Sequence, residues 1–431
     1  MYLGIDFGTS GCRAVVIDKK QSVISQTRVA LAAPKQHQNH ITQQSEGWIH
    51  VLQQLFRQLA QCTDLSRIKR LSINGTSATV LLCDKHGTAL SPALMYNDNS
   101  SRDAVLLIKQ HCPLPAHLSM RVTSGLAKAI QLMDLLGDEG VKESAKILSQ
   151  ADFLNNYLCG EWGISDYNNT FNLGFDVEKN SWPDWVSGLL PANALPRVVG
   201  PGDIIGSIQT HLARQFGLSE HCQICAGTTD SNAAFIATGS HHPGDAVTSL
   251  GTTLVIKILN EQPVNDLESG VYSHKLGDYW LCGGASNAGG GILRQFFSDQ
   301  QLIDYSRQID PQHSSGLDYY PLTRTGERFP INDPDKEPLI EPRPESDIEF
   351  LHALLEGLSR IEQRGYQKLI ALGSIAPSQI QTSGGGAQNP QWRALRQQLL
   401  DIPVTVASQT QAAFGSAILA LEGLSAYQRS T

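Results

Sequence analysis

The chain has 431 residues, 41% of them hydrophobic and 17% charged, which predicts a globular protein of two domains rather than one core. Its net charge of −8 at pH 7 provides no basic surface for nucleic acid, so no nucleic-acid partner is expected. No apolar run approaches the ~20 residues that cross a bilayer, and Asp6 interrupts the N-terminus before a signal peptide's apolar core could form, so no membrane partner is expected.

The first half of the chain alternates predicted strands and helices. Strands are expected at residues 2–5, 12–17, 68–73 and 79–83, where apolar and β-branched residues are bounded by turn residues. Helices are expected at residues 47–61, 126–136 and 149–162, where apolar residues recur at helical spacing. Gly160 is expected to close the last of these helices. This alternation predicts an α/β fold.

The second half begins with a pattern that repeats the opening of the chain. Residues 246–259 read strand, Gly-Thr-Thr turn, strand, and residues 3–18 read strand, Gly-Thr-Ser turn, strand. A Pro- and Gly-containing stretch at 241–247 precedes the repeat, so the predicted domains are 1–242 and 243–431. Further on we expect a helix at 348–372, a strand at 402–407 and a final helix near 412–424.

The eight cysteines are scattered along the chain, a pattern typical of reduced thiols in a cytoplasmic protein. Cys222 and Cys225 form the only close pair in the sequence, and no second pair or histidines at zinc-ligand spacing follow convincingly. We therefore interpret both as small apolar residues of a buried strand.

The turn after the first predicted strand combines an acid, Asp6, with Gly8, Thr9 and Ser10. Successive backbone N–H groups in such a turn can form a concave nest that binds phosphate oxygens. A carboxylate beside a phosphate is repulsive unless a cation lies between them, so Asp6 suits a Mg²⁺ ligand. A plain hairpin with a capping aspartate explains the same residues. A Walker loop is excluded because the chain contains no Gly-Lys dipeptide.

Asp230 follows a predicted strand and precedes small residues that can begin a helix. A carboxylate at a strand end can act as a general base and take the proton from a hydroxyl that attacks a γ-phosphate. The alternative is a helix N-cap for residues 232–237, and the residues alone favour it. The turn Gly251, Thr252 and Thr253 has the same two interpretations as the opening turn.

Near the end of the chain, SGGGAQN (383–389) places three glycines between a strand and a helix. Backbone without side chains lets a flat base or a ribose approach closely. A flexible turn before a helix is the alternative, but consecutive glycines are entropically costly, which favours the approach of a ligand.

The order of these motifs resembles the FGGY family of carbohydrate kinases, which belongs to the ATPase class of hexokinase and actin. Further segments resemble the family pattern and extend the resemblance over nearly the whole chain: 75–87, 152–176, 195–206, 325–335, 353–360 and 414–420. The resemblance implies an α/β fold of two RNase H-like, actin-like ATPase domains with a catalytic cleft between them.

The resemblance implies transfer of the γ-phosphate of ATP to a sugar hydroxyl, with ATP and Mg²⁺ as cofactors. It implies that Asp6 binds the metal and the substrate and that Asp230 is the catalytic base. Phosphoryl transfer depends mainly on positioning and charge neutralisation, which such a set supplies. The implied contacts to the phosphates and the adenosine are turn and small residues: Gly8, Thr9, Ser10, Gly251, Thr252, Thr253, Gly385, Gly386, Ala387 and Asn389.

One segment departs from the family pattern. Members acting on xylulose or glycerol usually have W-x-D-x-R after the second hairpin, and here Tyr96 replaces the Trp, Asp98 remains and Ser100 replaces the Arg. The short chain, the MYND segment and the SGGGAQNPQW segment resemble a subgroup associated with D-ribulose. We therefore predict a ketopentose substrate, D-ribulose first, with xylulose, glycerol and ribitol as alternatives.

The expected sugar contacts, besides Asp6 and Asp230, are Thr76, Ser77 and Asp98, for which hairpin-turn and Asx-turn roles are the alternatives. A nucleotide-dependent sugar sensor without transfer activity is the second hypothesis. Asp230 argues against it, because a sensor needs no base. The predicted partners are the sugar and ATP, and the protein is expected to be a monomer or a homodimer.

Overall fold

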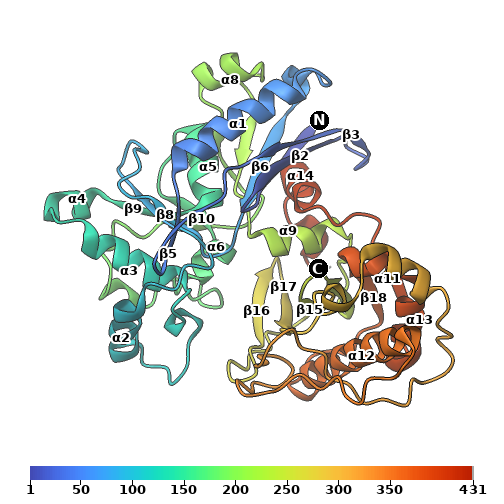
Figure 1. Ribbon diagram of the computed structural model, residues 1–431. Coiled ribbons are helices and arrows are strands. Elements are labelled where there is room, and N and C mark those ends of the chain that lie inside the picture. Colours follow the sequence, from blue (N-terminus) through green and yellow to red (C-terminus); the bar gives the residue numbers. More distant parts are fainter. Residues whose placement is uncertain (430–431) are drawn as a thin grey trace. The chain divides into compact units, whose positions relative to one another are not determined.

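The computed structural model describes residues 1–429, which fall into two units with separate apolar cores (Figure 1). The first unit contains residues 1–237 and 411–425, and the second contains residues 238–410 and the described residues from 426 onward. The chain therefore returns to the first unit near its end, which the sequence did not indicate. The division into 1–242 and 243–431 stays a prediction of domain organisation.

The first unit is built on a six-stranded sheet in which the opening hairpin is central. In their order across the sheet the strands are β12 (Ile204–Ser207), β13 (Gln223–Cys225), β6 (Arg70–Gly75), β1 (Tyr2–Phe7), β2 (Gly11–Ile17) and β3 (Val23–Ala30). β1, β2 and β3 pair antiparallel, whereas β6 runs parallel to β1 and β13 runs parallel to β6. The carboxyl ends of β1, β6 and β13 therefore share one edge.

Side chains of β1 alternate between the two faces of this sheet, and helices cover both faces. Leu3 and Ile5 belong to the apolar cluster that includes Trp48. Gly4 faces the other way, and a Cβ there would lie 2.0 Å from the carbonyl oxygen of Ala413. Figure 1 shows α14 (Ala412–Glu422), the helix that contains Ala413, beside β2, and the same helix packs against β1. The helices packed on the sheet are α1 (Ser45–Leu59), α5 (Gln150–Cys159), α8 (Thr210–Phe216), α9 (Asp230–Ala237) and α14.

A smaller five-stranded sheet in the same unit carries the second hairpin and has its own apolar core. Its strands, in order, are β4 (Lys35–His37), β5 (His40–Gln43), β8 (Ala93–Leu94), β7 (Val80–Cys83) and β9 (Lys146–Ser149). The helices and short strands around it are α2 (Arg102–His111), α3 (Gly125–Leu135), α4 (Glu139–Ser144), α6 (Tyr167–Phe171), α7 (Asp184–Ser187), β10 (Ile164–Asp166) and β11 (Arg197–Val199).

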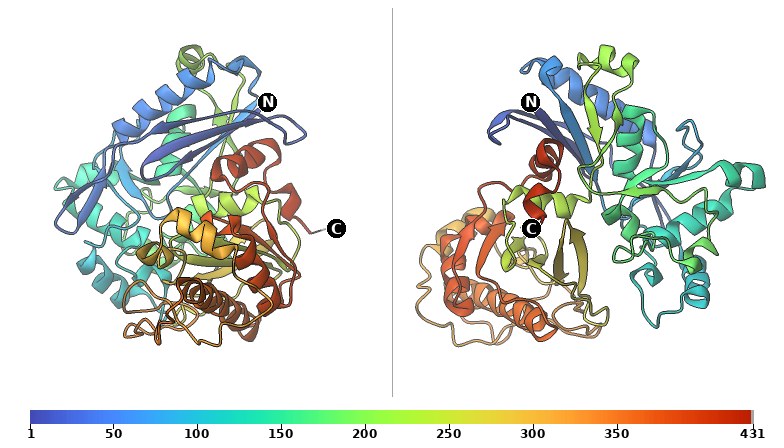
Figure 2. Two further views of the ribbon diagram at one scale, coloured as in Figure 1. Left: turned by 45° about the vertical axis from the view of Figure 1, so that its right-hand side comes forward. Right: turned by 180° about the vertical axis from the view of Figure 1, so that it is seen from behind.

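The second unit repeats five strands of the first sheet in the same order and directions, and its sixth strand, β16 (Tyr272–Leu276), lies at the opposite edge from β12. Its strands, in order, are β16, β17 (Tyr279–Ala285), β15 (Leu254–Asn260), β14 (Asp245–Leu250), β18 (Gln379–Ser383) and β19 (Val404–Val406). β14, β15 and β17 pair antiparallel, and β18 and β19 run parallel to β14. The repeated turn in the sequence thus marks a repeated sheet. The helices are α10 (Leu293–Phe296), α11 (Asp299–Ser306), α12 (Asp347–Ala371) and α13 (Pro390–Leu400), with α12 beside α13 (Figure 2).

Most elements predicted from the sequence are confirmed. The early strands and helices correspond to β1, β2, β6, β7, α1, α3 and α5, and the late ones to α12, β19 and α14. Gly160 ends α5 with φ of 80°, the left-handed conformation expected of a closing glycine. Cys222 and Cys225 are free, buried thiols at β13, as interpreted. No helix within residues 1–429 is long and apolar enough to cross a membrane.

A buried ion pair joins the helices and strands of the second unit. Arg396 of α13 donates through Nε and Nη2 to the two carboxylate oxygens of Glu362 of α12, at 2.5 and 2.7 Å. Arg396 also donates to Thr382 of β18 at 2.7 Å, and Thr248 of β14 donates to Glu362 at 2.5 Å. Both charged side chains are almost fully buried. The pair therefore fixes the two parallel strands β14 and β18 to the helix layer.

Arg396→Met should lower the free energy of unfolding of the second unit by about 3–5 kcal/mol, because Glu362 is left as a buried charge without its partner. Urea unfolding followed by circular dichroism measures this. Arg324→Met, at an exposed position of the same unit, is the control and should change the stability by less than about 0.5 kcal/mol. The double variant Arg396→Met with Glu362→Leu should regain part of the loss, and a double variant as unstable as the single one would contradict this account.

Candidate active site

Strand direction brings two acidic residues to the same edge of the first sheet. In the parallel pairing of β1 with β6, Asp6 lies opposite Asn74, and Phe7 lies opposite Gly75. Gly75 in turn bridges to Thr229, and α9 begins at the next residue, Asp230. Ligands of sheets with parallel strands bind beyond the carboxyl ends of those strands. The structure therefore brings Asp6 and Asp230 together, although they are 224 positions apart in the sequence.

Asp6 is buried to an extent that changes its chemistry. Its side chain is on the face of β1 that Gly4 shares, towards α14, and only 8% of the residue is exposed. Burial, and secondarily the charge of Asp230, raise the pKa of Asp6 from its usual 3.8 to about 7, and Arg13 opposes the rise. Among the described residues, none offers a hydrogen bond to Asp6 Oδ1. An oxygen in this state is suited to a cation or a proton.

Two neighbours of Asp6 also present oxygens to this edge. Asn74 Oδ1 and Thr229 Oγ1 are buried, and within residues 1–429 neither has a hydrogen-bond partner. Asn74 itself is fixed, because its Nδ2 donates to Ser416 of α14 at 2.7 Å. Nowhere in the described part of the chain do three or more His, Cys, Asp or Glu side chains gather as a metal site. Mg²⁺ commonly binds through one or two carboxylates and completes its shell with water and phosphate oxygens, so Asp6 and Asp230 fit it.

The opening turn is held against the first unit through its carbonyl groups. The backbone N–H of Gly8 donates to the carbonyl of Gly11 at 3.0 Å, and the carbonyl of Ser10 accepts from Leu31 at 3.0 Å. The carbonyl of Thr9 accepts from Gln43 Nε2 at 3.2 Å. These hydrogen bonds fix the turn next to Asp6, and none of residues 8–11 has a positive φ, so the binding of an anion by this turn stays a prediction.

Thr76 and Ser77 lie in the turn that connects β6 of the first sheet to β7 of the smaller sheet. The two strands do not pair, so this is not the hairpin turn that was the alternative role. Thr76 is nearly buried, and its N–H and hydroxyl donate to Gln150 Oε1 at 3.1 and 3.0 Å. Ser77 is more exposed, and its hydroxyl accepts from Asn172 Nδ2 at 3.0 Å. Gln150 and Asn172 are positioning residues that the sequence analysis missed, because their partners lie 74 and 95 positions away.

Asp98 has the Asx-turn geometry that the sequence analysis left open. It is fully buried, and its Oδ1 accepts from the backbone N–H and the hydroxyl of Ser100 at 3.1 and 2.6 Å. Its Oδ2 accepts from the N–H of Ile41 at 2.7 Å. Both carboxylate oxygens are thus occupied, one by the loop of Asp98, which includes the half-exposed Tyr96, and the other by β5. A contact between Asp98 and a sugar stays a prediction.

A cavity of about 750 Å³ in the second unit gathers half of the residues predicted to bind nucleotide. Gly8, Thr9 and Ser10 belong to the first unit, Thr253 and Ala387 are outside the lining, and Ala387 is buried. The predicted residues that do line it are Gly251, Thr252, Gly385, Gly386 and Asn389. Sequence reasoning missed others, among them Gly290, Arg294, Arg307 and Trp392. Only the glycine run at 289–291 was a signal for these, since the arginines come from α10 and from the turn after α11.

The glycine turn at the cavity is shaped by close backbone contacts. Gly384 has φ of 84°, and a Cβ there would lie 2.6 Å from the carbonyl oxygen of Leu250. A Cβ on Gly385 would meet nothing within 4 Å, so this residue faces open space. Asn389 caps α13 by accepting from the N–H of Trp392 at 3.0 Å, and it also donates to Ser306 of α11 at 2.8 Å. The turn therefore presents bare backbone to the cavity.

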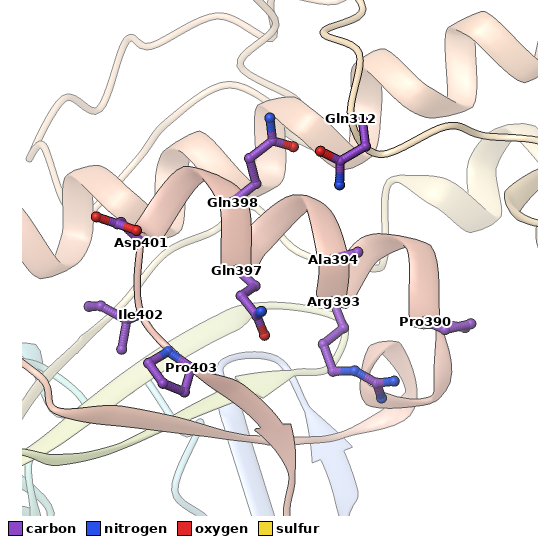
Figure 3. Close-up of a pocket in the computed structure, with 9 residues that line it drawn as sticks. All are labelled: Gln312, Pro390, Arg393, Ala394, Gln397, Gln398, Asp401, Ile402 and Pro403. Atoms are coloured by element: carbon purple, nitrogen blue, oxygen red, sulfur yellow. The ribbon is translucent and has the colours of Figure 1, made fainter.

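A second hollow, of about 570 Å³, runs along the side of α13 (Figure 3). Its lining comes from α13, the turn that follows it and Gln312. None of the residues predicted to be functional contributes to it. It is lined by Gln312, Pro390, Arg393, Ala394, Gln397, Gln398, Asp401, Ile402 and Pro403.

Comparison with known proteins agrees with this arrangement. Residues 1–237 match the N-terminal domain of the FGGY family of carbohydrate kinases, and residues 246–423 match the C-terminal domain. With the repeated sheets, these matches define a phosphotransferase that acts on a sugar hydroxyl. The chain belongs to the FGGY family of carbohydrate kinases, which confirms the resemblance drawn from its motifs. The enzyme interpretation is thereby confirmed over that of a sugar sensor.

Similar proteins include the xylulose kinase of Escherichia coli, which is 24% identical over 416 residues covering 93% of this chain and 84% of that protein. The solved structure of a xyloylose kinase from Brucella ovis has a TM-score of 0.87 at 23% identity and covers 98% of this chain and 90% of its own. A glycerol kinase from Plasmodium falciparum has a TM-score of 0.85 at 16% identity, with coverages of 97% and 88%. These similarities confirm the predicted α/β fold of two actin-like domains.

Asp6→Asn should stabilise the first unit by about 2–4 kcal/mol at pH 8 and by less at pH 5, since each pKa unit is worth about 1.4 kcal/mol. The folded chain binds a proton at Asp6 up to about pH 7, whereas the unfolded chain releases it near 3.8. Wild-type stability is therefore lost as the pH rises through this window, and asparagine carries no charge to bury. Urea unfolding at both pH values measures the difference. The exposed control Asp134→Asn should not change the free energy of unfolding at either pH. Equal effects of Asp6→Asn at the two pH values would contradict the burial of a charge at Asp6.

Proposed function

We propose that this carbohydrate kinase transfers the γ-phosphate of ATP to a hydroxyl of a ketopentose, with D-ribulose as the preferred substrate. The observation that carries the transfer step is the meeting of Asp6 and Asp230 at the carboxyl edge of β1, β6 and β13. The preference for D-ribulose is supported by the short chain and by the MYND segment, in which Tyr96 and Ser100 replace the Trp and Arg of the family pattern.

In this proposal the two acids have different tasks. Asp230, at the first position of α9 and partly exposed, accepts the proton of the sugar hydroxyl as its oxygen attacks the γ-phosphorus. Asp6 binds Mg²⁺, which when present neutralises charge on the phosphates. The buried position of Asp6 makes its negative charge costly in the absence of a cation, so the site favours the metal-loaded nucleotide. Thr9 and Ser10 provide backbone N–H groups to the phosphates, whereas the N–H of Gly8 is already donated to the carbonyl of Gly11 within the turn.

The cavity of the second unit suits the rest of the nucleotide. Its volume of about 750 Å³ is within the range of small-molecule sites. Gly251 and Thr252 at the end of β14 are proposed to contact phosphate, and Gly385 and Gly386 to lie against the adenosine. The buried pair of Glu362 and Arg396 holds β14 and β18, the strands that end in these two turns, in register.

A second candidate substrate is D-xylulose. The similar proteins from Escherichia coli and Bacillus subtilis are xylulose kinases, each 24% identical to this chain. D-Ribulose and D-xylulose are ketopentoses that differ in the configuration at one carbon, so the contacts from Thr76 and Ser77 and the shape of the loop at Tyr96 would decide between them.

A substrate panel with wild type and Asp230→Asn tests the proposal. Wild type should produce ADP with D-ribulose faster than with D-xylulose, ribitol or glycerol, and Asp230→Asn should lower kcat about 10²–10⁴-fold because the general base is lost. A coupled ADP assay measures both, and Asp134→Asn is the matched control. Phosphorylation of glycerol alone would refute the ketopentose assignment. A fully active Asp230→Asn would refute the role of the base.

Gly385→Ala should raise the KM for ATP about tenfold without lowering the melting temperature, since a methyl group would enter the cavity but meet no protein atom within 4 Å. The KM for the sugar should not change. Gly137→Ala, also at a glycine whose Cβ would meet nothing within 4 Å, is the control in the first unit. An unchanged KM for ATP in Gly385→Ala would place the adenosine elsewhere.

A further inference from the structure

A lysine is fully buried in the core beside the second hairpin. Lys128 is on α3 and is 0% exposed, and the residues before and after it, Ala127 and Ala129, are equally buried. Taking an ammonium group out of water is costly unless it is paired or hydrogen-bonded. Burial lowers the pKa of Lys128 to about 7, and the nearby charge of Asp98 opposes this shift. A methionine or leucine would pack at this position without that cost, so the charge calls for another explanation.

The ammonium group of Lys128 links two segments that are distant in the sequence. Its Nζ donates to the carbonyl oxygen of Ala78 at 2.9 Å and to that of Tyr96 at 3.1 Å. Ala78 is in the turn between β6 and β7 with Thr76 and Ser77, and Tyr96 is in the loop of Asp98. These two segments carry every proposed sugar contact of the first unit except Asp6 and Asp230.

The backbone at Ala78 needs such an anchor. Its φ of 60° is in the left-handed region, which costs a residue other than glycine roughly 1–2 kcal/mol. Such conformations persist where surrounding contacts enforce them, and they concentrate at functional sites. A second contact joins the same segments, because the N–H of Tyr96 donates to Thr79 Oγ1 at 3.0 Å. The turn and the loop are thus fixed to each other at two points.

We propose that Lys128 is a positioning residue for the sugar, which sets the spacing between the turn 76–79 and the loop 95–98 through the carbonyl groups of Ala78 and Tyr96. It does not touch the substrate, because it is completely buried. It acts by presenting Thr76 and Ser77, and the side chain of Tyr96, to the sugar in one arrangement. This inference rests on the proposed function, in which these segments bind the sugar.

Lys128→Met tests the proposal, because methionine is of similar length and apolar but has no N–H donors. We expect the KM for the sugar to rise about tenfold or more, since small displacements of positioning groups have large effects, while kcat and the KM for ATP stay close to wild type. Lys109→Met, at an exposed position of α2, is the control and should leave all three constants unchanged. An unchanged KM for the sugar, or an equal rise in the KM for ATP, would overturn the proposal.

Hydrogen–deuterium exchange gives a reading that does not depend on activity. In Lys128→Met, exchange should become faster in residues 76–79 and 95–98 and stay unchanged in β1 and β6. Lys128→Gln, which keeps an amide donor, should fold and fall between wild type and Lys128→Met. A uniform acceleration of exchange across the first unit, or loss of folding in both variants, would show that Lys128 only stabilises the core and would overturn the proposal.

The two proposals fail in different ways. The activity of the wild type on the panel decides the substrate. The ratio of the KM for the sugar in Lys128→Met to that in the wild type decides the role of Lys128. If the wild type prefers glycerol or ribitol, the ketopentose assignment is wrong and the ratio is measured with that polyol. If it accepts none of them, the exchange measurement decides the role of Lys128 alone.

Discussion

The parallel pairing of β1 with β6 is the constraint on which the rest of the candidate site depends. Because the two strands run in the same direction with Asp6 opposite Asn74, their carboxyl ends meet at one edge, where the bridge from Gly75 to Thr229 adds the start of α9. A single-residue change of register would turn Asp6 towards the opposite face of the sheet. The close contact of Gly4 with α14 opposes such a change, since no side chain fits there.

The site of the second unit also depends on a pair of parallel strands, which is held in place by a different interaction. Its parallel strands β14 and β18 end in the two glycine-containing turns that line the cavity, and their register places Ser249 opposite Ser383. Here a buried ion pair, rather than a glycine contact, ties the strands to the helices. An ion pair of this kind is weak evidence for stability, but its directional hydrogen bonds specify one arrangement of strands and helices. Two sheets that share a five-stranded arrangement thus hold their ligand-facing turns by different interactions.

Hydrogen-bond occupancy separates the candidate polar residues into two groups. Asp98 and Asn389 have their side-chain oxygens occupied by backbone N–H groups, and each orders its own segment. Asp6 has an oxygen that is buried and, among the residues described, without a partner, and its pKa is raised accordingly. Buried polar groups are normally satisfied, so an exception marks a place where a ligand completes the structure. This difference is invisible in the sequence, where Asp6 and Asp98 are both acids beside turns.

The α/β class, most strands and helices, the repeated hairpin and the kinase family could be predicted from the residues alone, because periodicity, turn residues and ordered motifs are local properties of the chain. Which polar residues meet depends on the folding of distant segments onto each other: Asp6 with Asp230, Thr76 with Gln150, and Lys128 with Ala78 and Tyr96. The packing of α14 on β1 of the first unit depends on it as well. These contacts join residues tens to hundreds of positions apart, and their geometry follows from strand register and burial.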